Sequence, residues 1–340
     1  MTAIAAAIPG RSRAATSHGP VYAGLLLVLL GAMLASLSLG YRLYSLPELW
    51  AALFANDGSE TATVIAGLRL PRALLAPVVG AALGMSGVMV QTLARNRIAS
   101  PDTLGLNAGA SLAVVIATVM LGVQSLVGLS LAAALGALIT SLVVFGLAAG
   151  SGGLSALKIV LVGVTVASLA HAAVQVLLTS NEVQLQQLLF WLSGAFVDRP
   201  ISLLFSGLPV VLAGTGGAFV LAGALDAVQA DDTTAAGLGV PLVAVRGAAF
   251  VSVSLLTGAA VSMAGPVAFV GLVVPHMARR LVGLRHRHQL LAAALTGAIY
   301  TTLADVAARF VIYPVEAPVG AITAVIGGVA LLALLMRRLA

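Results

Sequence analysis

The sequence predicts an all-α polytopic membrane protein with about ten transmembrane helices. Of its 340 residues, 60% are hydrophobic and only 8% are charged, and the mean hydropathy is +1.11. Soluble domains carry about 25% charged residues, so this composition excludes a soluble globular enzyme and a disordered chain. The apolar residues form long runs, unlike the alternating strands of outer-membrane barrels. A membrane span needs about 20 apolar residues, so the chain accommodates roughly ten spans with short connections.

The apolar runs and the polar breaks between them define the expected elements. Residues 1–20 are expected to form a cytoplasmic tail, and residues 21–340 a single transmembrane domain. The second run is too long for one straight span, and the eighth is short and contains Pro275. The expected helices cover residues 21–40, 62–94, 102–122, 126–149, 159–179, 201–224, 246–265, 268–282, 289–308 and 318–337.

The first apolar run has the plan of a signal peptide, because Arg11 and Arg13 precede it. It is longer than a usual signal core, no clear cleavage site follows it, and further spans come after it. We therefore expect an uncleaved first helix.

The basic residues predict the orientation. With the N-terminus inside, twelve of the 17 basic residues fall on the cytoplasmic side and five fall outside. This asymmetry follows the positive-inside rule and predicts cytoplasmic N- and C-termini. It also accounts for the net charge of +6, and no basic stripe interleaved with aromatic residues points to nucleic acid.

Two absences from the composition limit the chemistry. The chain has no cysteine, which excludes disulfides, cysteine-ligated iron–sulfur clusters and thiol catalysis. Its only lysine, Lys158, follows Leu157, whereas a P-loop needs Gly-Lys followed by Ser or Thr. We expect no cofactor in this chain, and any ATP must be bound by a partner subunit.

Asp305 is the one carboxylate expected near the end of a span. An ion-coupled secondary transporter usually needs an ionisable group inside the membrane, and Asp305 is its only candidate. Arg309 lies four residues later, so a helix-end ion pair is the simpler interpretation.

His171 and Gln175 lie one turn apart within a predicted span. His171 is either a buried neutral histidine bonded to a carbonyl or, with Gln175, part of a polar translocation path. Because no His-Glu-x-x-His motif occurs, zinc hydrolysis is unsupported.

The segment Gly84-Met-Ser86-Gly87 is similar to the Gly-x-Ser-Gly motif of rhomboid proteases. Ser86 would be the nucleophile of such an intramembrane serine protease. The ten-span plan is too large for that family, and its early histidine pair is missing.

Three arginines are expected at the outer face, where Arg69 and Arg72 enter the second helix and Arg309 ends the ninth. Arginine forms forked contacts with carboxylates, so exposed arginines here could dock an acidic soluble partner. Interfacial snorkelling is the alternative for each residue alone.

The longest internal cytoplasmic stretch, about residues 225–245, has the pattern of a short helix. Asp231, Asp232 and Thr233 can cap its first amides, whereas Gly237 and Gly239 precede Pro241 and predict its end. Such a helix could couple the protein to a motor, although a solvated loop has the same composition.

Several ordered motifs together resemble the FecCD-type permeases over residues 60–338. Arg97-Ile98 and Ala317 depart from the usual pattern. The matching motifs are Arg69-Leu-Pro-Arg72, Val79-Gly-Ala-Ala-Leu-Gly84, Gln91-x-x-x-x-Asn96, Ala99-Ser-Pro-Asp-x-Leu-Gly105, Ala236-Gly-Leu-Gly-Val-Pro241, Ala264-Gly-Pro-Val-Ala-Phe-Val-Gly-Leu-Val-Val-Pro-His276, Leu303-Ala-Asp-x-x-Ala-Arg309 and Pro318-Val-Gly-x-Ile-Thr323.

This resemblance implies a type II ABC importer permease fold and a dimer of identical or related permeases. It implies two ATPase subunits and a periplasmic or lipid-anchored substrate-binding protein as partners. Arg69, Arg72 and Arg309 would dock the binding protein. The coupling segment for the ATPase would contain Asp231, Asp232, Thr233, Ala236, Gly237 and Gly239.

The expected function is therefore the membrane subunit of an ATP-driven importer, which catalyses no covalent reaction. The Ala-Gly-Pro-Val-Ala-Phe run and the Asp-Asp-Thr-Thr-Ala segment resemble permeases for ferric citrate and related ferric siderophores. Haem and cobalamin stay open as alternative substrates within the family.

Overall fold

The computed structural model describes residues 18–54, 58–150, 155–180, 188, 189 and 191–339. The regular elements of the described part are helices, apart from one isolated β-bridge between Ile312 and Val315. Seven of its helices are long and apolar enough to cross a membrane. They are α1 (Gly19–Ser38), the continuous segment Glu60–Leu93, α6 (Leu126–Gly150), α7 (Ala156–Thr179), α9 (Ser202–Ala230), α11 (Leu242–Ala264) and α13 (His286–Ala308).

Each of the ten expected segments falls on a helix, but the count of ten spans is not confirmed. The helix α5 (Leu106–Val119) has 14 residues and α12 (Val270–Val282) has 13, so both are shorter than a straight span needs. The last helix, α14 (Val319–Leu339), is apolar in sequence as far as Met336 and is not counted among the seven. The sequence also missed α2 (Leu46–Phe54), which lies between α1 and α3 (Glu60–Val64).

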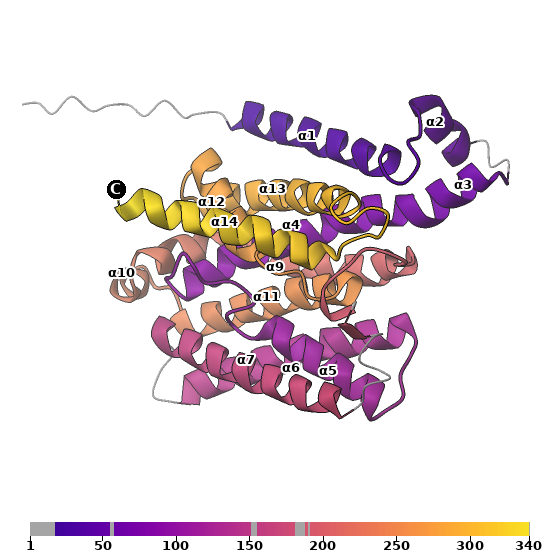
Figure 1. The fold of residues 1–340 in the computed structure, drawn as a ribbon. Helices are drawn as coiled ribbons and strands as arrows, with labels where there is room; N and C mark the ends of the chain where they lie inside the picture. The colour runs from indigo at the N-terminus through magenta and orange to yellow at the C-terminus, as the bar shows by residue number, and fades with distance from the viewer. Residues whose placement is uncertain (1–17, 55–57, 151–154, 181–187, 190, 340) are drawn as a thin grey trace, which may run out of the picture.

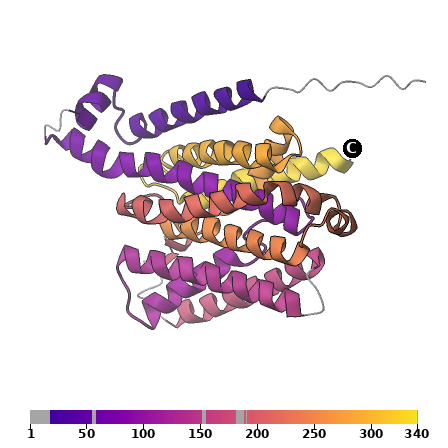
Figure 2. The same ribbon diagram turned by 180° about the vertical axis from the view of Figure 1, so that it is seen from behind.

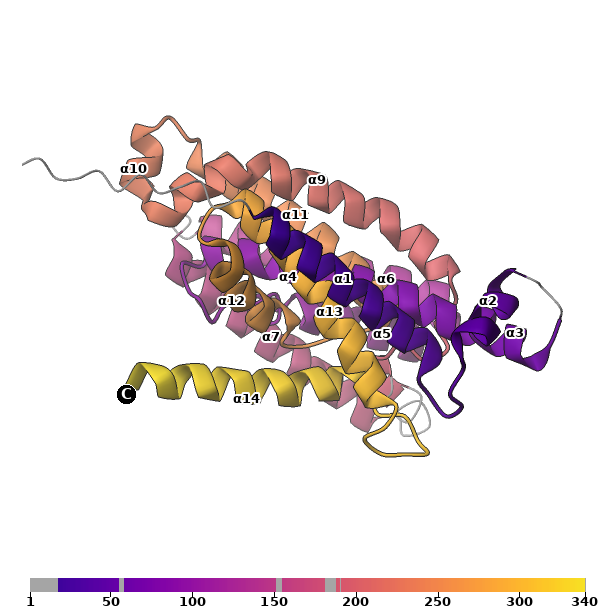
Figure 3. The same ribbon diagram turned by 90° about the horizontal axis from the view of Figure 1, so that it is seen from above.

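The helix α4 (Leu70–Leu93) lies at the centre of the bundle and is buried over most of its length. It packs against α13, α11, α12 and α9. Helix α11 connects α4 to α6, and α5 packs against both α6 and α7. Figures 1 and 2 show the resulting order, with α1 along one side of the bundle and the α5–α7 group on the other. Seen from above, α14 diverges from α13 (Figure 3).

The expected helix at 62–94 is one continuous segment built from three pieces. Ser59 begins it, because its hydroxyl accepts a hydrogen bond from the Ala62 amide at 3.1 Å. A single π-helical turn, η1 (Ile65–Arg69), then joins α3 to α4. This turn and Pro71 at the start of α4 mark the entry into the buried part of the bundle.

Glycines create the closest helix contacts in the core. A Cβ atom at Gly80 of α4 would overlap the backbone of Gly297 on α13, and one at Gly84 would overlap the Ala293 carbonyl. Small residues on both helices therefore let the two backbones touch, which favours tight association without a hydrophobic driving force. Gly80 and Gly84 are four residues apart, the Gly-x-x-x-Gly spacing that favours this kind of packing.

Candidate functional site

Arg69, Arg72 and Arg309 lie close together at one end of the bundle, which we call the arginine end. Arg72 is in the first turn of α4, Arg69 immediately precedes that helix, and Arg309 follows the last residue of α13. All three were expected to be exposed, but they retain only 5–8% of their accessible surface. That expectation of exposure was wrong, because each guanidinium is bonded inside the protein.

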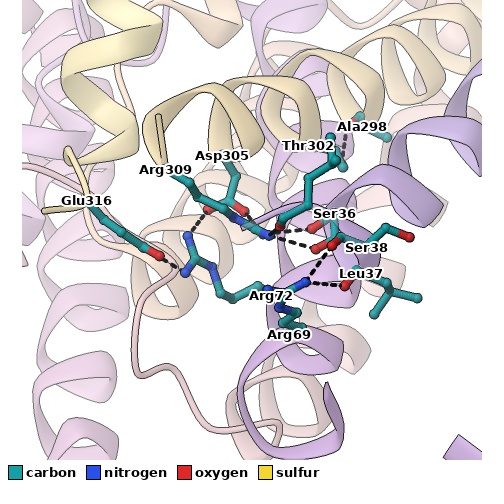
Figure 4. A network of polar contacts seen from close by, with 11 residues as sticks. Ser36, Leu37, Ser38, Arg69, Arg72, Ala298, Thr302, Asp305, Arg309 and Glu316 are labelled. Atoms are coloured by element: carbon teal, nitrogen blue, oxygen red, sulfur yellow. Dashed lines mark hydrogen bonds and ion pairs between the residues drawn. The ribbon is translucent and has the colours of Figure 1, made fainter. Parts of the chain in front are cut away.

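Asp305 connects two of these arginines (Figure 4). It is fully buried, and its Oδ1 accepts a hydrogen bond from Arg72 Nη2 at 2.8 Å. Its Oδ2 accepts a second one from Arg309 Nη2 at 2.5 Å, the expected helix-end pair. A buried carboxylate is costly unless it is paired and hydrogen-bonded, and both oxygens of Asp305 satisfy that condition here.

Arg69 and Arg309 also hold the end of α1. Arg309 Nη1 donates to the carbonyls of Ser36 and Leu39, each at 2.7 Å. Arg69 Nη1 donates to the carbonyls of Leu37 and Ser38, each at 2.8 Å. The last carbonyls of a helix have no partner within it, and positive charge there is favourable. These two arginines therefore serve as side-chain caps for the C-terminal end of α1.

Glu316 is the outermost member of the arginine end. It lies in the connection between α13 and α14, and its Oε2 accepts a hydrogen bond from Arg72 Nη1 at 2.7 Å. Its side chain keeps 35% of its accessible surface, whereas that of Asp305 keeps none. The sequence had not pointed to Glu316, because it lies 244 positions from Arg72 along the chain.

The short helix α10 (Asp232–Gly237) occupies the opposite end of the bundle (Figures 1 and 3). Asp231 caps it, because its Oδ1 accepts from the Thr234 amide at 2.6 Å and its Oδ2 from the Thr234 hydroxyl at 2.5 Å. These hydrogen bonds lower the pKa of Asp231 to about 2. The helix ends before Gly239, whose φ of +76° suits a glycine.

Two ion pairs join α10 to the long helices. The Oδ1 of Asp232 accepts from Arg95 at 2.5 Å and from Arg246 at 2.6 Å. Arg95 lies just beyond the end of α4, and Arg246 is in the first turns of α11. Ala235 of α10 is buried, so this helix packs on the bundle in a fixed position.

The outer surface of α10 is exposed. Thr233, Ala236, Gly237 and Gly239 of the predicted coupling set are accessible, and Leu238 keeps 70% of its surface. An exposed leucine at the tip of a fixed element is a candidate contact for another protein.

His171 and Gln175 both lie on the exposed surface of α7, so His171 is not the buried histidine of the simpler interpretation. Among the described residues, neither side chain forms a hydrogen bond. His171 borders a cavity of about 430 Å³ together with Asp102, Asn107, Ser111 and Ser193. The residues Gly320 and Ala321 of α14 line the same cavity.

Asp102 and Asn107 are functional candidates that the sequence analysis missed. The Asn107 amide donates to the Asp102 carboxylate, while the buried Oδ1 of Asn107 has no partner. Asp102 was expected to begin a span, but α5 starts only at Leu106, after a turn that contains Pro101 and Gly105. The motif Ala99-Ser-Pro-Asp already contains Asp102, although no local sequence pattern indicates that this carboxylate lies beside a cavity.

Ser86 is fully buried, and its hydroxyl is bonded to that of Thr257 at 2.8 Å rather than to a histidine. Across the part of the chain that the structure describes, three or more His, Asp or Glu side chains do not gather into a metal site. Within the described residues Ser86 is therefore not part of a serine–histidine pair of the kind that a protease requires.

The fold is that of an ABC-transporter permease. The chain is 30% identical to a metal-chelate type ABC transporter solved in an inward-facing conformation, with a TM-score of 0.83. That match covers 94% of this chain and 99% of the solved one. The model of the FecCD transport family matches residues 26–337, and the chain belongs to this family.

Curated relatives support the same assignment. The protein named "Probable siderophore transport system permease protein YfiZ" of Bacillus subtilis is 37% identical over 92% of this chain and 94% of its own length. The Fe(3+)-citrate import system permease protein YfmD of the same organism is also 37% identical, over 86% and 87%. The Fe(3+) dicitrate transport system permease protein FecD of Escherichia coli is 36% identical, over 88% and 93%.

This protein is therefore a multi-span membrane permease subunit of an ABC transporter and not itself an enzyme. The family implies separate ATPase and substrate-binding partners.

Proposed function

We propose that this chain forms the membrane passage of an importer for ferric chelates, namely ferric siderophores or ferric citrate. The observation that carries the proposal is family membership together with relatives named for siderophore and Fe(3+)-citrate import. The chain has no cofactor of its own in this proposal, and ATP is bound by the partner ATPase.

The proposed topology has ten spans in the bacterial cytoplasmic membrane, with both termini in the cytoplasm. The short helices α5, α12 and α14 complete the count beside the seven long ones. The N-terminal tail and the single transmembrane domain keep the expected limits of 1–20 and 21–340. The arginine end then faces outward, and α10 faces the cytoplasm.

The proposed translocation path runs along α7 and α14 at an interface between two permeases. Its support is that α7 exposes the side chains of His171 and Gln175, to which lipid offers no hydrogen bonds. Polar groups at membrane depth face a bundle interior, another subunit or a water-filled cavity. The cavity beside Asp102 and Asn107 opens onto the same surface of α7.

The proposed coupling segment is α10 with its flanking residues. Asp231, Asp232 and Thr233 begin it, and Ala236, Gly237 and Gly239 form its accessible surface. ATP binding would close the ATPase pair and move α10, and the ion pairs of Asp232 would carry that movement to α4 and α11. The nucleotide would thereby shift the balance between outward- and inward-open packings.

The proposed docking site for the binding protein is Arg69, Arg72 and Arg309. Their guanidiniums are internally bonded, yet three positive charges meet only two carboxylates there, Asp305 and Glu316. The remaining positive charge favours an acidic partner. Replacing all three arginines should weaken docking, and unchanged docking and uptake in that triple variant would overturn this assignment.

The test is reconstitution of the permease with its ATPase and binding protein in proteoliposomes. ATP-dependent uptake of radiolabelled ferric citrate or a ferric siderophore is the expected result, with haem and cobalamin as matched comparisons. Uptake of only haem or cobalamin would contradict the substrate assignment. Uptake that needs no ATPase would contradict the importer mechanism and favour an ion-coupled carrier.

A further inference from the structure

The two carboxylates that contact Arg72 differ in how firmly they are held. Asp305 is fully buried and uses both oxygens, one for Arg72 and one for Arg309. Glu316 is one-third exposed, and within the described residues Arg72 is its only hydrogen-bond partner. Figure 4 shows Glu316 approaching Arg72 from a connecting segment rather than from a packed helix. Asp305 is thus a fixed partner, whereas Glu316 can be exchanged.

Arg72 needs a carboxylate in the place of Glu316. Asp305 already shares its charge between two guanidiniums, so it does not neutralise Arg72 alone. A buried charge that loses its partner is strongly unfavourable, and another anion at the same nitrogen restores the balance. The buried Nε of Arg72 and that of Arg309 also lack partners, so neither guanidinium has all of its donors satisfied.

We propose that Glu316 is an internal substitute for a carboxylate of the binding protein, and that docking exchanges one carboxylate for the other on Arg72. The inference rests on the proposed docking function of the three arginines. Because Glu316 competes for the same guanidinium, it weakens docking and favours release of the binding protein after delivery of the substrate.

The exchange also affects α14. Glu316 lies three residues before Val319, where that helix begins, and the next residues of the helix, Gly320 and Ala321, line the cavity. Release of Glu316 from Arg72 therefore frees the connection that leads directly to the cavity wall. Docking of the binding protein would thus be connected to the proposed passage by only a few residues of backbone.

The experiment measures binding-protein affinity for the complete permease–ATPase complex in nanodiscs. The probe is the binding protein that supports ferric-chelate uptake in the reconstituted system. Glu316→Gln should lower the Kd by about three- to tenfold, since one competing charged contact is removed. Glu48→Gln is the matched control, because Glu48 is a partly exposed glutamate whose carboxylate contacts Ser45 and Arg42 rather than the three arginines.

The outcomes separate this inference from the docking function. If Glu48→Gln has no effect and Glu316→Gln tightens binding, the exchange is supported. Unchanged or weaker binding in Glu316→Gln, with Arg72→Gln still weakening it, overturns the exchange and leaves the docking function standing. If Arg72→Gln has no effect, the docking assignment fails as well. Glu316→Asp keeps the charge and should restore most of the original Kd.

Discussion

The two ends of the bundle present candidate surfaces in opposite ways. At the arginine end, the charged groups are buried and bonded to one another and to the end of α1. At the other end, α10 exposes its surface and is held by the Asp231 cap and by the ion pairs of Asp232. The arginines proposed to contact a charged partner are thus held by carboxylates inside the protein that would compete with that partner. The proposed apolar contact, in contrast, is held by groups that do not take part in the contact.

This difference has a physical reason. Guanidiniums left unpaired near a membrane would be costly, so their positions are maintained by internal carboxylates and carbonyls. An exposed apolar side chain such as Leu238 carries a smaller penalty and needs only a rigid base. The predictions below test these two arrangements against each other.

The largest effect is expected at Asp305. Asp305→Asn leaves two buried guanidiniums without a full counter-charge and should lower the free energy of unfolding by about 3–5 kcal/mol. Glu316→Gln removes a partner of the same arginine that is one-third exposed, and it should cost less than about 1 kcal/mol. Thermal unfolding of both purified variants in detergent checks this. Equal losses of unfolding free energy in the two variants would mean that Asp305 and Glu316 contribute equally to stability.

The next effect is expected at Asp232, which supports α10. Asp232→Ala removes both ion pairs and should reduce substrate transported per ATP hydrolysed by about tenfold, since two charge-assisted bonds are lost. The measurement compares uptake and ATP hydrolysis in the same proteoliposomes. Asp232→Glu retains the charge and should recover part of the coupling. A normal ratio in the alanine variant would argue against α10 as the coupling segment.

A smaller effect is expected at Leu238. Leu238→Ser should leave thermal unfolding unchanged because the side chain is exposed. It should weaken association with the ATPase by about fivefold, which corresponds to about 1 kcal/mol for the partial burial of one leucine. Affinity measured in detergent checks this prediction. Unchanged affinity would place the ATPase contact elsewhere.

The smallest effect concerns Asp231 and pH. Its folded pKa of about 2 lies below the ordinary value of 3.8, so its stabilisation of α10 is present above about pH 4 and is lost as pH falls toward 2. Hydrogen exchange of the Thr234 amide should therefore be constant between pH 5 and 8, after correction for intrinsic rates, and lose protection in acid. In Asp231→Asn, that acid-dependent loss should disappear. If the Asp231→Asn variant still lost protection of the Thr234 amide in acid, another titrating group would be responsible.

Much of the helical plan could be predicted from local sequence. Apolar runs located the long helices, and the Asp231 cap with Gly239 located α10. The arginine end could not be predicted in this way, because the carbonyls that hold Arg309 come from Ser36 and Leu39, about 270 positions away. The cavity beside Asp102 was missed for the same reason, since its walls come from several separate elements.

Helix α4 takes part in both ends of the molecule. Arg72 is in its first turn, Arg95 follows its last turn, and the contact of Gly80 with Gly297 joins it closely to α13. With 24 residues, α4 extends over about 36 Å. If this helix pair tilts about its middle, Arg72 and Arg95 move at the same time and in opposite directions. The proposed docking site and the proposed coupling segment are therefore linked through one helix, and a change of orientation at one end is a measurable displacement at the other.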